Sequence, residues 1–254
     1  MDQERERIQA DLRGLLDGDV YCDDVFVQMY AADASVYEIR PLGVVRPRGL
    51  ADVVACVQYA AENEIPLHAR GAGSGLAGES IGPGLVVDFS YAMRRILAWE
   101  HEAVRVQPGV VCALLNRFLA ERGRTYGPDP ATLNVSTMGS VLALNSAGSH
   151  WLRYGSARDT VLSLQVVLAD GSVIEASRHA VEEPASSDPG VARRQALIRD
   201  LASVLEPARS LIEQHTPKTK VNRSGYHLAG VLRDGTLALA RLLVGSQGTP
   251  ALIT

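Results

Sequence analysis

The chain has 254 residues, 46% hydrophobic and 21% charged, which excludes a disordered chain and predicts one large domain or two packed lobes. Its 25 basic and 29 acidic side chains give a net charge of −4, and with only 5% aromatic residues they argue against a nucleic-acid partner. The densely charged N-terminus predicts no signal peptide, and no apolar run reaches the roughly 20 residues of a membrane helix. The isolated cysteines Cys22, Cys56 and Cys112 favour a reducing cytoplasm, without a disulfide framework or a metal site.

The first part of the chain predicts an amphipathic helix followed by a βαβ unit. Apolar residues keep helical spacing over 4–16 and over 50–63, and Pro66 ends the second pattern. Short apolar strands are expected at 44–45, 65–70 and 85–89. Since a connection of this length favours parallel strands, we expect a right-handed crossover between the first two.

The remaining residues predict further strands and helices. Strands are expected over 96–99, 104–106, 161–168 and 173–176, with a hairpin turn at 169–172. Helices are expected over 110–122, where Gly123 is the C-terminal stop, and over about 193–214. Other segments are a rigid stretch at 126–130, apolar runs at 138–144 and 237–244, and a polar surface excursion at 180–192.

A glycine-rich loop follows the strand expected at 65–70. Residues 73–78 read GSGLAG and match the GxGxxG pattern of dinucleotide-binding folds. That pattern must open a helix, but Gly82, Pro83 and Gly84 leave no room for one, so a nicotinamide Rossmann site is disfavoured. Closely spaced glycines still allow backbone amides to bind a phosphate, with Arg70 adding positive charge. The alternative is a flexible surface connector.

Ordered motifs through the chain resemble those of one family. They are Val44-Val45-Arg46-Pro47, Arg70-Gly71-Ala72-Gly73-Ser74-Gly75, Gly127-Pro128-Asp129-Pro130, Thr137-Met138-Gly139-Ser140, Asn145-Ser146-Ala147-Gly148-Ser149, Arg153-Tyr154-Gly155 and Gly245-Ser246-Gln247-Gly248-Thr249. Over about residues 30–254 the chain resembles the FAD-binding domain of the PCMH, or vanillyl-alcohol-oxidase, type. The resemblance is strongest to FAD-linked oxidases and dehydrogenases of D-2-hydroxy acids: D-lactate dehydrogenases, the glycolate oxidase flavin subunit and D-2-hydroxyglutarate dehydrogenases.

The resemblance implies an α+β fold with two lobes, a small βαβ lobe and a larger mixed-sheet lobe with flanking helices. The expected division is an N-terminal helical segment over 1–30, a first FAD-binding lobe over 31–98 and a second over 99–254. It also implies a flavin-dependent oxidoreductase module, in which a small D-2-hydroxy acid loses a hydride to flavin N5. The alternative is a non-catalytic FAD-binding fragment or subunit that needs a partner chain.

The resemblance further implies where the cofactor lies. Residues Arg70, Gly71, Ala72, Gly73, Ser74, Gly75 and Gly78 would hold the FAD pyrophosphate; Pro128, Asp129, Met138, Gly139 and Ser140 would line the cofactor channel; and Asn145, Ala147, Gly148, Arg153, Tyr154 and Gly155 would lie beside the flavin. Three of these residues have structural alternatives: a turn cap for Asn145, a turn former for Asp129, and a surface cation over an aromatic ring for Arg153. His150 is kept as a further candidate because it adjoins the motif that would face the flavin.

Three features depart from the family pattern. No histidine occurs over 69–84, where some relatives tether FAD covalently, so a dissociable FAD is expected. Gln247 stands where the family usually has an acidic residue, and Pro250-Ala251 replaces its Leu-Gly. The chain is expected to be truncated before the cap domain, which in relatives supplies much of the substrate site. We therefore name no catalytic base, and a partner chain could supply the cap or an iron–sulfur electron acceptor.

Overall fold

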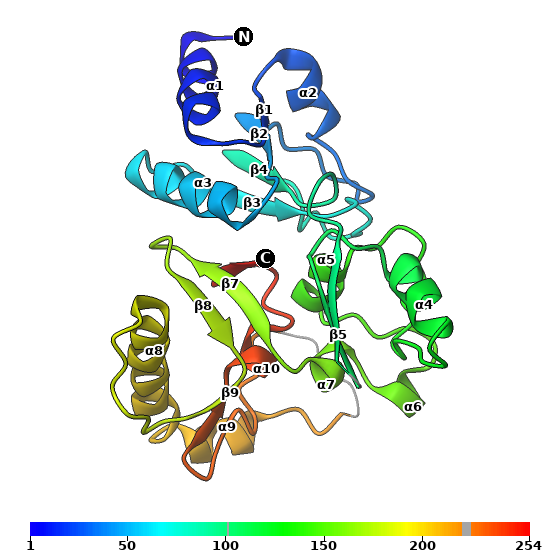
Figure 1. The fold of residues 1–254 in the computed structure, drawn as a ribbon, viewed down its shortest axis with the longest axis vertical. Helices are drawn as coiled ribbons and strands as arrows, with labels where there is room; N and C mark the ends of the chain where they lie inside the picture. Colours follow the sequence, from blue (N-terminus) through cyan, green and yellow to red (C-terminus); the bar gives the residue numbers. More distant parts are fainter. Residues whose placement is uncertain (101, 220–224) are drawn as a thin grey trace.

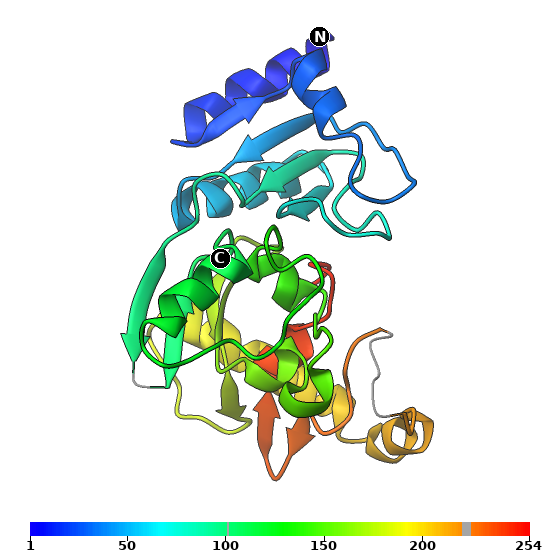
Figure 2. The same cartoon turned by 90° about the vertical axis from the view of Figure 1, so that its right-hand side faces the viewer.

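The computed structural model describes residues 1–100, 102–219 and 225–254, and its two lobes stack along the long axis of the molecule (Figure 1). The N-terminal lobe is blue to cyan and the second lobe is green to red. The two are joined through the hairpin of β5 (Ile96–Glu100) and β6 (Ala103–Val106), which Figure 2 shows along one side of the molecule. The C-terminus lies close to the junction of the lobes.

A four-stranded sheet forms the first lobe. Its order is β1 (Asp19–Tyr21), β2 (Gly43–Arg46), β4 (Leu85–Asp88) and β3 (Leu67–Arg70). Strands β2 and β3 both run parallel to β4, which lies between them, whereas β1 pairs antiparallel with β2. The predicted strands and their parallel direction are confirmed. Strand β1 was not predicted, because it is three residues long and buries only Val20, too little to show an alternating pattern.

Helices α1 (Gln3–Leu15), α2 (Asp24–Met29) and α3 (Leu50–Glu62) belong to the same lobe. Asp2 caps α1 by accepting a hydrogen bond from the amide of Arg5. Helix α1 packs on α3 and buries Ile8 and Leu12 completely. These residues and the buried Leu16 confirm most of the apolar face predicted for 4–16, whereas Leu15, expected on the same face, is exposed. The core of this lobe also includes Val167 and Leu252 from the second lobe, which joins the two lobes through buried apolar contacts.

Small antiparallel sheets form the second lobe, which was expected as the larger, mixed-sheet lobe with flanking helices. One has the order β12 (Ala251–Ile253), β7 (Leu164–Leu168), β8 (Val173–Ala176), and another has the order β10 (Leu232–Arg233), β11 (Thr236–Ala238), β9 (Arg178–Ala180). The hairpin of β5 and β6 is separate from both. Tight turns join β7 to β8 and β10 to β11, and such short connections pair strands antiparallel.

The helices of the second lobe are α4 (Cys112–Ala120), α5 (Met138–Ala143), α6 (Trp151–Tyr154), α7 (Ala157–Thr160), α8 (Pro189–Leu205), α9 (Arg209–His215) and α10 (Leu239–Leu243). The single helix predicted over 193–214 is two helices, because Pro207 lies between α8 and α9 and cannot continue an α-helix. Helix α8 starts inside the predicted surface excursion, where Asp188 caps it and Pro189 occupies its first turn. In the part of the chain that is described, no helix has both the length and the apolar character to span a bilayer.

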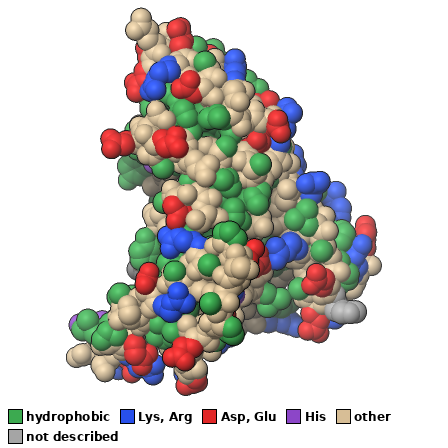
Figure 3. Space-filling view, turned by 60° about the vertical axis from the view of Figure 1, so that its left-hand side comes forward, with side chains coloured by type: hydrophobic (Ala, Val, Ile, Leu, Met, Phe, Trp, Pro, Cys, Tyr) green, Lys and Arg blue, Asp and Glu red, His purple; other side chains and the backbone are tan. Residues whose placement is uncertain are grey.

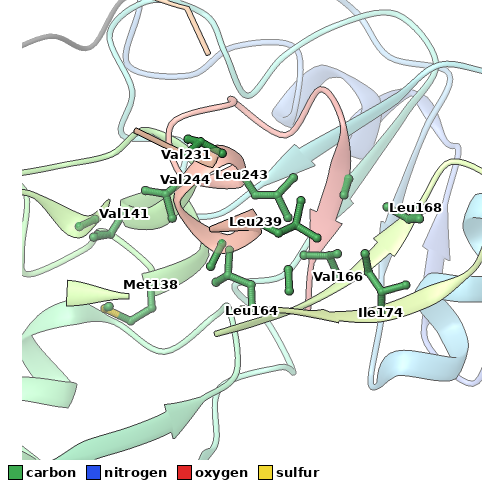
Figure 4. Close-up of a cluster of buried hydrophobic side chains, with 14 of the residues drawn as sticks. Met138, Val141, Leu164, Val166, Leu168, Ile174, Val231, Leu239, Leu243 and Val244 are labelled. Atoms are coloured by element: carbon green, nitrogen blue, oxygen red, sulfur yellow. The ribbon is translucent and has the colours of Figure 1, made fainter. Parts of the chain in front are cut away.

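The core of the second lobe packs β7 and β8 against α10. In Figure 4, Leu164 and Val166 of β7 and Ile174 of β8 face Leu239 and Leu243 of α10. Val141 and Met138 extend the same cluster into α5. One side of helix α5 therefore packs on this core, and its opposite side faces the junction between the lobes.

Candidate cofactor site

A cleft lies at the junction of the lobes, between the end of β3 and helix α5. The first lobe contributes the start of the glycine-rich loop, and the second contributes α5, the preceding loop and the segment that leads into β12. The lining residues are Ala69, Arg70, Gly71, Gly73, Ser74, Gly75, Glu79, Ser80, Phe89, Pro108, Thr132, Ser136, Thr137, Gly139, Ser140, Val141, Ala143, Leu144, Ser146, Gln247, Gly248, Ala251 and Ile253. Of the residues predicted to bind the cofactor, this cleft brings together Arg70, Gly71, Gly73, Ser74, Gly75, Gly139 and Ser140.

The glycines of the loop allow a close approach that other residues would prevent. At Gly71 an added Cβ would overlap the hydroxyl oxygens of Thr137 and Ser140, so the loop lies directly on α5. Gly73 and Gly78 have φ values of +64° and +79°, which favour glycine. From Gly71 to Leu76, no backbone amide donates a hydrogen bond to another described residue. The loop therefore presents a row of free N–H donors beside the cleft, as an anion-binding turn requires.

Arg70 places a positive charge against this loop. Its Nη2 donates to the carbonyl of Ala32 at 2.9 Å, and its guanidinium carbon lies 5.0 Å from the centre of the Tyr30 ring. A Cβ added at Gly73 would lie 2.6 Å from the same Nη2. Among the described residues no carboxylate lies within ion-pair distance of Arg70, so its charge is uncompensated and available to an anion in the cleft.

Tyr30 is itself fixed by a buried polar network in the first lobe. Its hydroxyl donates to Asp88 at 2.5 Å and accepts from Nη2 of Arg46 at 2.8 Å. Burial, together with the hydrogen bond to Asp88, raises the pKa of Tyr30 to about 12, so the phenol stays neutral. The hydrogen bonds at its hydroxyl therefore fix the position of the Tyr30 ring, on which Arg70 stacks.

The second-lobe wall of the cleft is rich in hydroxyl groups. Thr132 and Ser136 lie 2.7 Å apart through their side-chain oxygens, and Thr137 and Ser140 lie 3.0 Å apart. Our sequence reasoning named only Ser140 among these four. Nothing in the sequence sets the other three apart, because Ser and Thr are common in loops. Met138 does not line the cleft, because its side chain packs into the core of the second lobe.

A second cluster lies beside this wall, around Asp129. Its carboxylate accepts from the backbone amide of His150 at 3.0 Å, from Nδ1 of His150 at 2.5 Å and from the Ser149 hydroxyl at 2.9 Å. Chiefly because of the backbone hydrogen bond, the pKa of Asp129 falls to about 2. Gly148 has a φ of +111° and forms a bridge with Asp129, so the loops at 127–130 and 146–150 are pinned together.

The other residues predicted beside the flavin have visible structural tasks. Asn145 is buried at a φ of +49°, and its side-chain oxygen accepts the amide hydrogen of Arg158 at 3.0 Å at the start of α7. The guanidinium of Arg153 lies 5.2 Å from the Tyr154 ring centre. Both arrangements correspond to the structural alternatives given above, a turn cap for Asn145 and a cation over an aromatic ring for Arg153. Neither of them lines the cleft, nor do Ala72, Gly78, Pro128, Asp129, Ala147, Gly148, Tyr154 or Gly155, so their roles toward the cofactor stay predictions.

Comparison with known proteins shows the family to which the chain belongs. The family described as FAD binding domain matches residues 41–177, more than half of the chain. The chain belongs to this FAD-binding family. The matched span contains the glycine-rich loop, α5 and the Asp129 cluster.

Several curated relatives are dehydrogenases or oxidases of hydroxy acids. D-2-hydroxyglutarate dehydrogenase of Pantoea ananatis is 33% identical over 233 residues, and the enzyme of Escherichia coli is 31% identical over 231. Each match covers 88% of this chain and 23% of the relative. Glycolate oxidase subunit GlcD of Bacillus subtilis is 33% identical over 165 residues, covering 63% of this chain and 35% of the relative. The chain thus spans about a quarter of the length of the two dehydrogenases.

Solved structures agree with the fold. Alkyldihydroxyacetonephosphate synthase matches all of this chain and 40% of its own with a TM-score of 0.64 at 18% identity, which is evidence of fold alone. 6-Hydroxy-D-nicotine oxidase from Arthrobacter nicotinovorans matches 64% of this chain and 36% of its own, with a TM-score of 0.56 and 28% identity. The two-lobed α+β architecture predicted from the sequence is therefore confirmed.

The residues of the cleft fit FAD. Free amides and the unpaired cation of Arg70 suit a diphosphate, whereas the hydroxyl-lined wall of α5 offers donors and acceptors to sugar or phosphate oxygens. The glycine at position 71 lets the loop pack directly against Thr137 and Ser140, where any larger residue would collide with them. FAD is accordingly the cofactor of this chain.

Proposed function

We propose that the chain is the FAD-binding module of a flavin-dependent oxidoreductase that acts on a small D-2-hydroxy acid, of the lactate, glycolate or 2-hydroxyglutarate class. The row of free amides from Gly71 to Leu76 at the junction of the lobes carries this proposal. The named activities of the relatives supply the substrate class. FAD, when bound, supplies the capacity to accept a hydride from the substrate carbon.

In this proposal, the residues of the chain position the cofactor and exclude water from it. The loop at 71–78 binds the diphosphate through its amides, and Arg70 adds a charge that the Tyr30 ring and the Ala32 carbonyl hold in place. Gly139 and Ser140 of α5 form the facing wall. The remaining predicted residues, around Asp129 and Asn145, would shape the cleft from one side.

We further propose that FAD is held without a covalent bond. The loop at 69–84 contains no histidine or cysteine that could form one. The nearby His68 is engaged, since its Nε2 lies 2.7 Å from the carbonyl oxygen of Pro83. Flavin should therefore appear in the supernatant after denaturing precipitation, and flavin that stays with the precipitated protein would contradict this part of the proposal.

A second candidate is an FAD-binding subunit that needs a partner chain for activity, either a cap-like chain or an iron–sulfur electron acceptor. A cytoplasmic location is proposed with both candidates and is supported by the three free, buried cysteines.

The deciding experiment is the absorbance spectrum of the purified protein, followed by a titration of the FAD-free protein with FAD monitored by flavin fluorescence. We expect a yellow protein and saturable quenching, with an unfolding temperature that rises with FAD concentration. A folded protein that neither retains nor binds FAD would overturn the proposal. Turnover of D-lactate, glycolate or D-2-hydroxyglutarate with an artificial acceptor then separates the two candidates.

A further inference from the structure

One acidic side chain lies in the cleft where an anionic ligand is expected. Glu79 belongs to the glycine-rich loop and is half-buried among the residues that line the cleft. Apart from Glu79 and Arg70, the lining residues carry no formal charge. A carboxylate in a diphosphate site opposes binding, because two like charges a few ångströms apart repel each other.

The Glu79 carboxylate lies against the backbone of the glycine-rich loop, at Gly75 and the Ala77 amide, which we call the glycine cradle. A Cβ added at Gly75 would overlap Oε1 of Glu79, so the carboxylate rests directly on the Gly75 backbone. Its other oxygen, Oε2, accepts the backbone N–H of Ala77 at 3.1 Å. One loop amide is thus already satisfied by an anion that the chain supplies.

No cation neutralises this carboxylate. Arg70 lies at the other end of the loop, against Gly73, and it forms no ion pair with Glu79. Across the described part of the chain, Glu79 has no basic side chain within 4 Å. Its place in the loop is explained by the hydrogen bond from the Ala77 amide and the contact with Gly75, rather than by an ion pair.

From this geometry we infer that Glu79 acts as an internal substitute for the diphosphate, occupying the cradle in the cofactor-free protein and setting the affinity for FAD. The inference rests on the proposed cofactor site at 71–78. Binding of the diphosphate requires the Glu79 side chain to leave Gly75 and the Ala77 amide. The apparent affinity is therefore the intrinsic affinity multiplied by the fraction of molecules in which Glu79 has left this position. Glu79 is thus a residue that tunes cofactor affinity, and it takes no part in the chemistry.

The test compares wild-type protein with Glu79→Gln and Glu79→Ala, each stripped of flavin. Glu79→Gln removes the charge and keeps the shape, whereas Glu79→Ala also empties the cradle. Three probes separate the parts of the ligand: FAD, ADP, which carries a diphosphate without flavin, and riboflavin, which carries flavin without a phosphate. The matched control is Glu62→Gln, which removes one negative charge from the exposed end of α3.

We expect Glu79→Gln to lower the Kd for FAD and for ADP about fivefold to tenfold, and Glu79→Ala to lower it at least as far. Riboflavin affinity should be unchanged in both, and Glu62→Gln should match the wild type for every probe. Weaker FAD binding in Glu79→Ala would overturn the inference and assign Glu79 as a direct ligand of the cofactor. An equal gain for riboflavin, or for Glu62→Gln, would also overturn it.

Failure of the proposed function has a different signature. In that case the wild type and all variants, with native circular dichroism, bind neither FAD nor ADP, and the inference falls with it. Binding of FAD by the wild type with identical Kd values in Glu79→Gln and Glu79→Ala would leave the proposed function standing and overturn the inference alone.

Discussion

Gly71 is the residue at which backbone geometry and cofactor binding meet. An alanine there would place its Cβ on the hydroxyls of Thr137 and Ser140, which are hydrogen-bonded to each other. Relief requires the loop to move away from α5 or the hydroxyls to rotate apart, and overpacking of this kind costs about 1–3 kcal/mol. We predict that Gly71→Ala weakens FAD binding at least tenfold, measured by fluorescence titration, and lowers the unfolding free energy by about 1–3 kcal/mol.

Gly14 offers the matched control for Gly71. It lies near the end of α1, and a Cβ there would meet no atom within 4 Å. Because alanine is favoured over glycine inside a helix by about 1 kcal/mol, Gly14→Ala should stabilise the protein slightly in urea denaturation and leave FAD affinity unchanged. Equal FAD affinity in Gly71→Ala and Gly14→Ala would show that the contact between the loop and α5 does not shape the site.

The Asp129 cluster predicts a defined pH dependence. The folded pKa of about 2 lies below the usual 3.8, so the folded state favours the carboxylate. Its contribution to stability is therefore complete above the unfolded pKa and is lost as the pH falls toward 2. A carbon NMR titration should give a midpoint near 2 for the Asp129 carboxyl. In His150→Ala the midpoint should rise only part of the way to 3.8, because the backbone amide and Ser149 remain as donors. A wild-type midpoint at 3.8 would contradict the cluster.

At the scale of elements, α1 shows how much stability a predicted amphipathic face carries. Ile8 and Leu12 are fully buried against α3 and the first sheet, whereas Leu15 on the same helix is 57% exposed. We predict that Leu12→Ala costs about 2–5 kcal/mol of unfolding free energy and that Leu15→Ala costs less than about 1 kcal/mol. Urea denaturation followed by circular dichroism measures both. Similar losses for the two variants would mean that α1 is held by something other than its packed face.

Elements with long periodic patterns could be predicted from the sequence, and short ones could not. Helices α1 and α3 and strands β2, β4 and β8 lie within about a residue of expectation, because each has a continuous apolar pattern or a clear turn beside it. Strand β12 could not be predicted, since its partner β7 lies more than 80 residues away and only the tertiary fold brings them together. Helices α6 and α7 are each a single turn, too short for periodicity to show.

The same limit applies to the candidate site. The glycine-rich loop was found because closely spaced glycines are a local signal, and the structure places Gly71, Gly73, Ser74 and Gly75 at the cleft. The wall formed by Thr132, Ser136 and Ser146 was missed, because hydroxyl residues are common in loops and only the fold selects those that face a cleft. Glu79 was not singled out either, since nothing in the sequence indicates that its side chain folds back onto Gly75.

At the scale of the whole molecule, acidic and basic side chains are interspersed over the face in Figure 3, so no single sign of charge dominates it. What joins the lobes is apolar instead. Val167 of β7 and Leu252 of β12 are buried in the core of the first lobe, although both strands belong to the second. The same β12 segment lines the cofactor cleft through Ala251 and Ile253. The cofactor wall and the connection between the lobes are therefore parts of one structural unit.

This shared core predicts that the two lobes unfold together. Trp99 and Trp151 both lie in the second lobe and report on it by fluorescence, whereas the buried thiols of Cys22 and Cys56 report on the first lobe by their reactivity. Leu252→Ala should lower the unfolding free energy by about 2–5 kcal/mol and shift both probes to the same lower urea midpoint. The control is Leu115→Ala, which makes the same substitution within the core of the second lobe, away from the junction. Separate midpoints for fluorescence and thiol reactivity, in the wild type or in Leu252→Ala, would show that the lobes are independent and that the cleft between them is held by the loop at 71–78 alone.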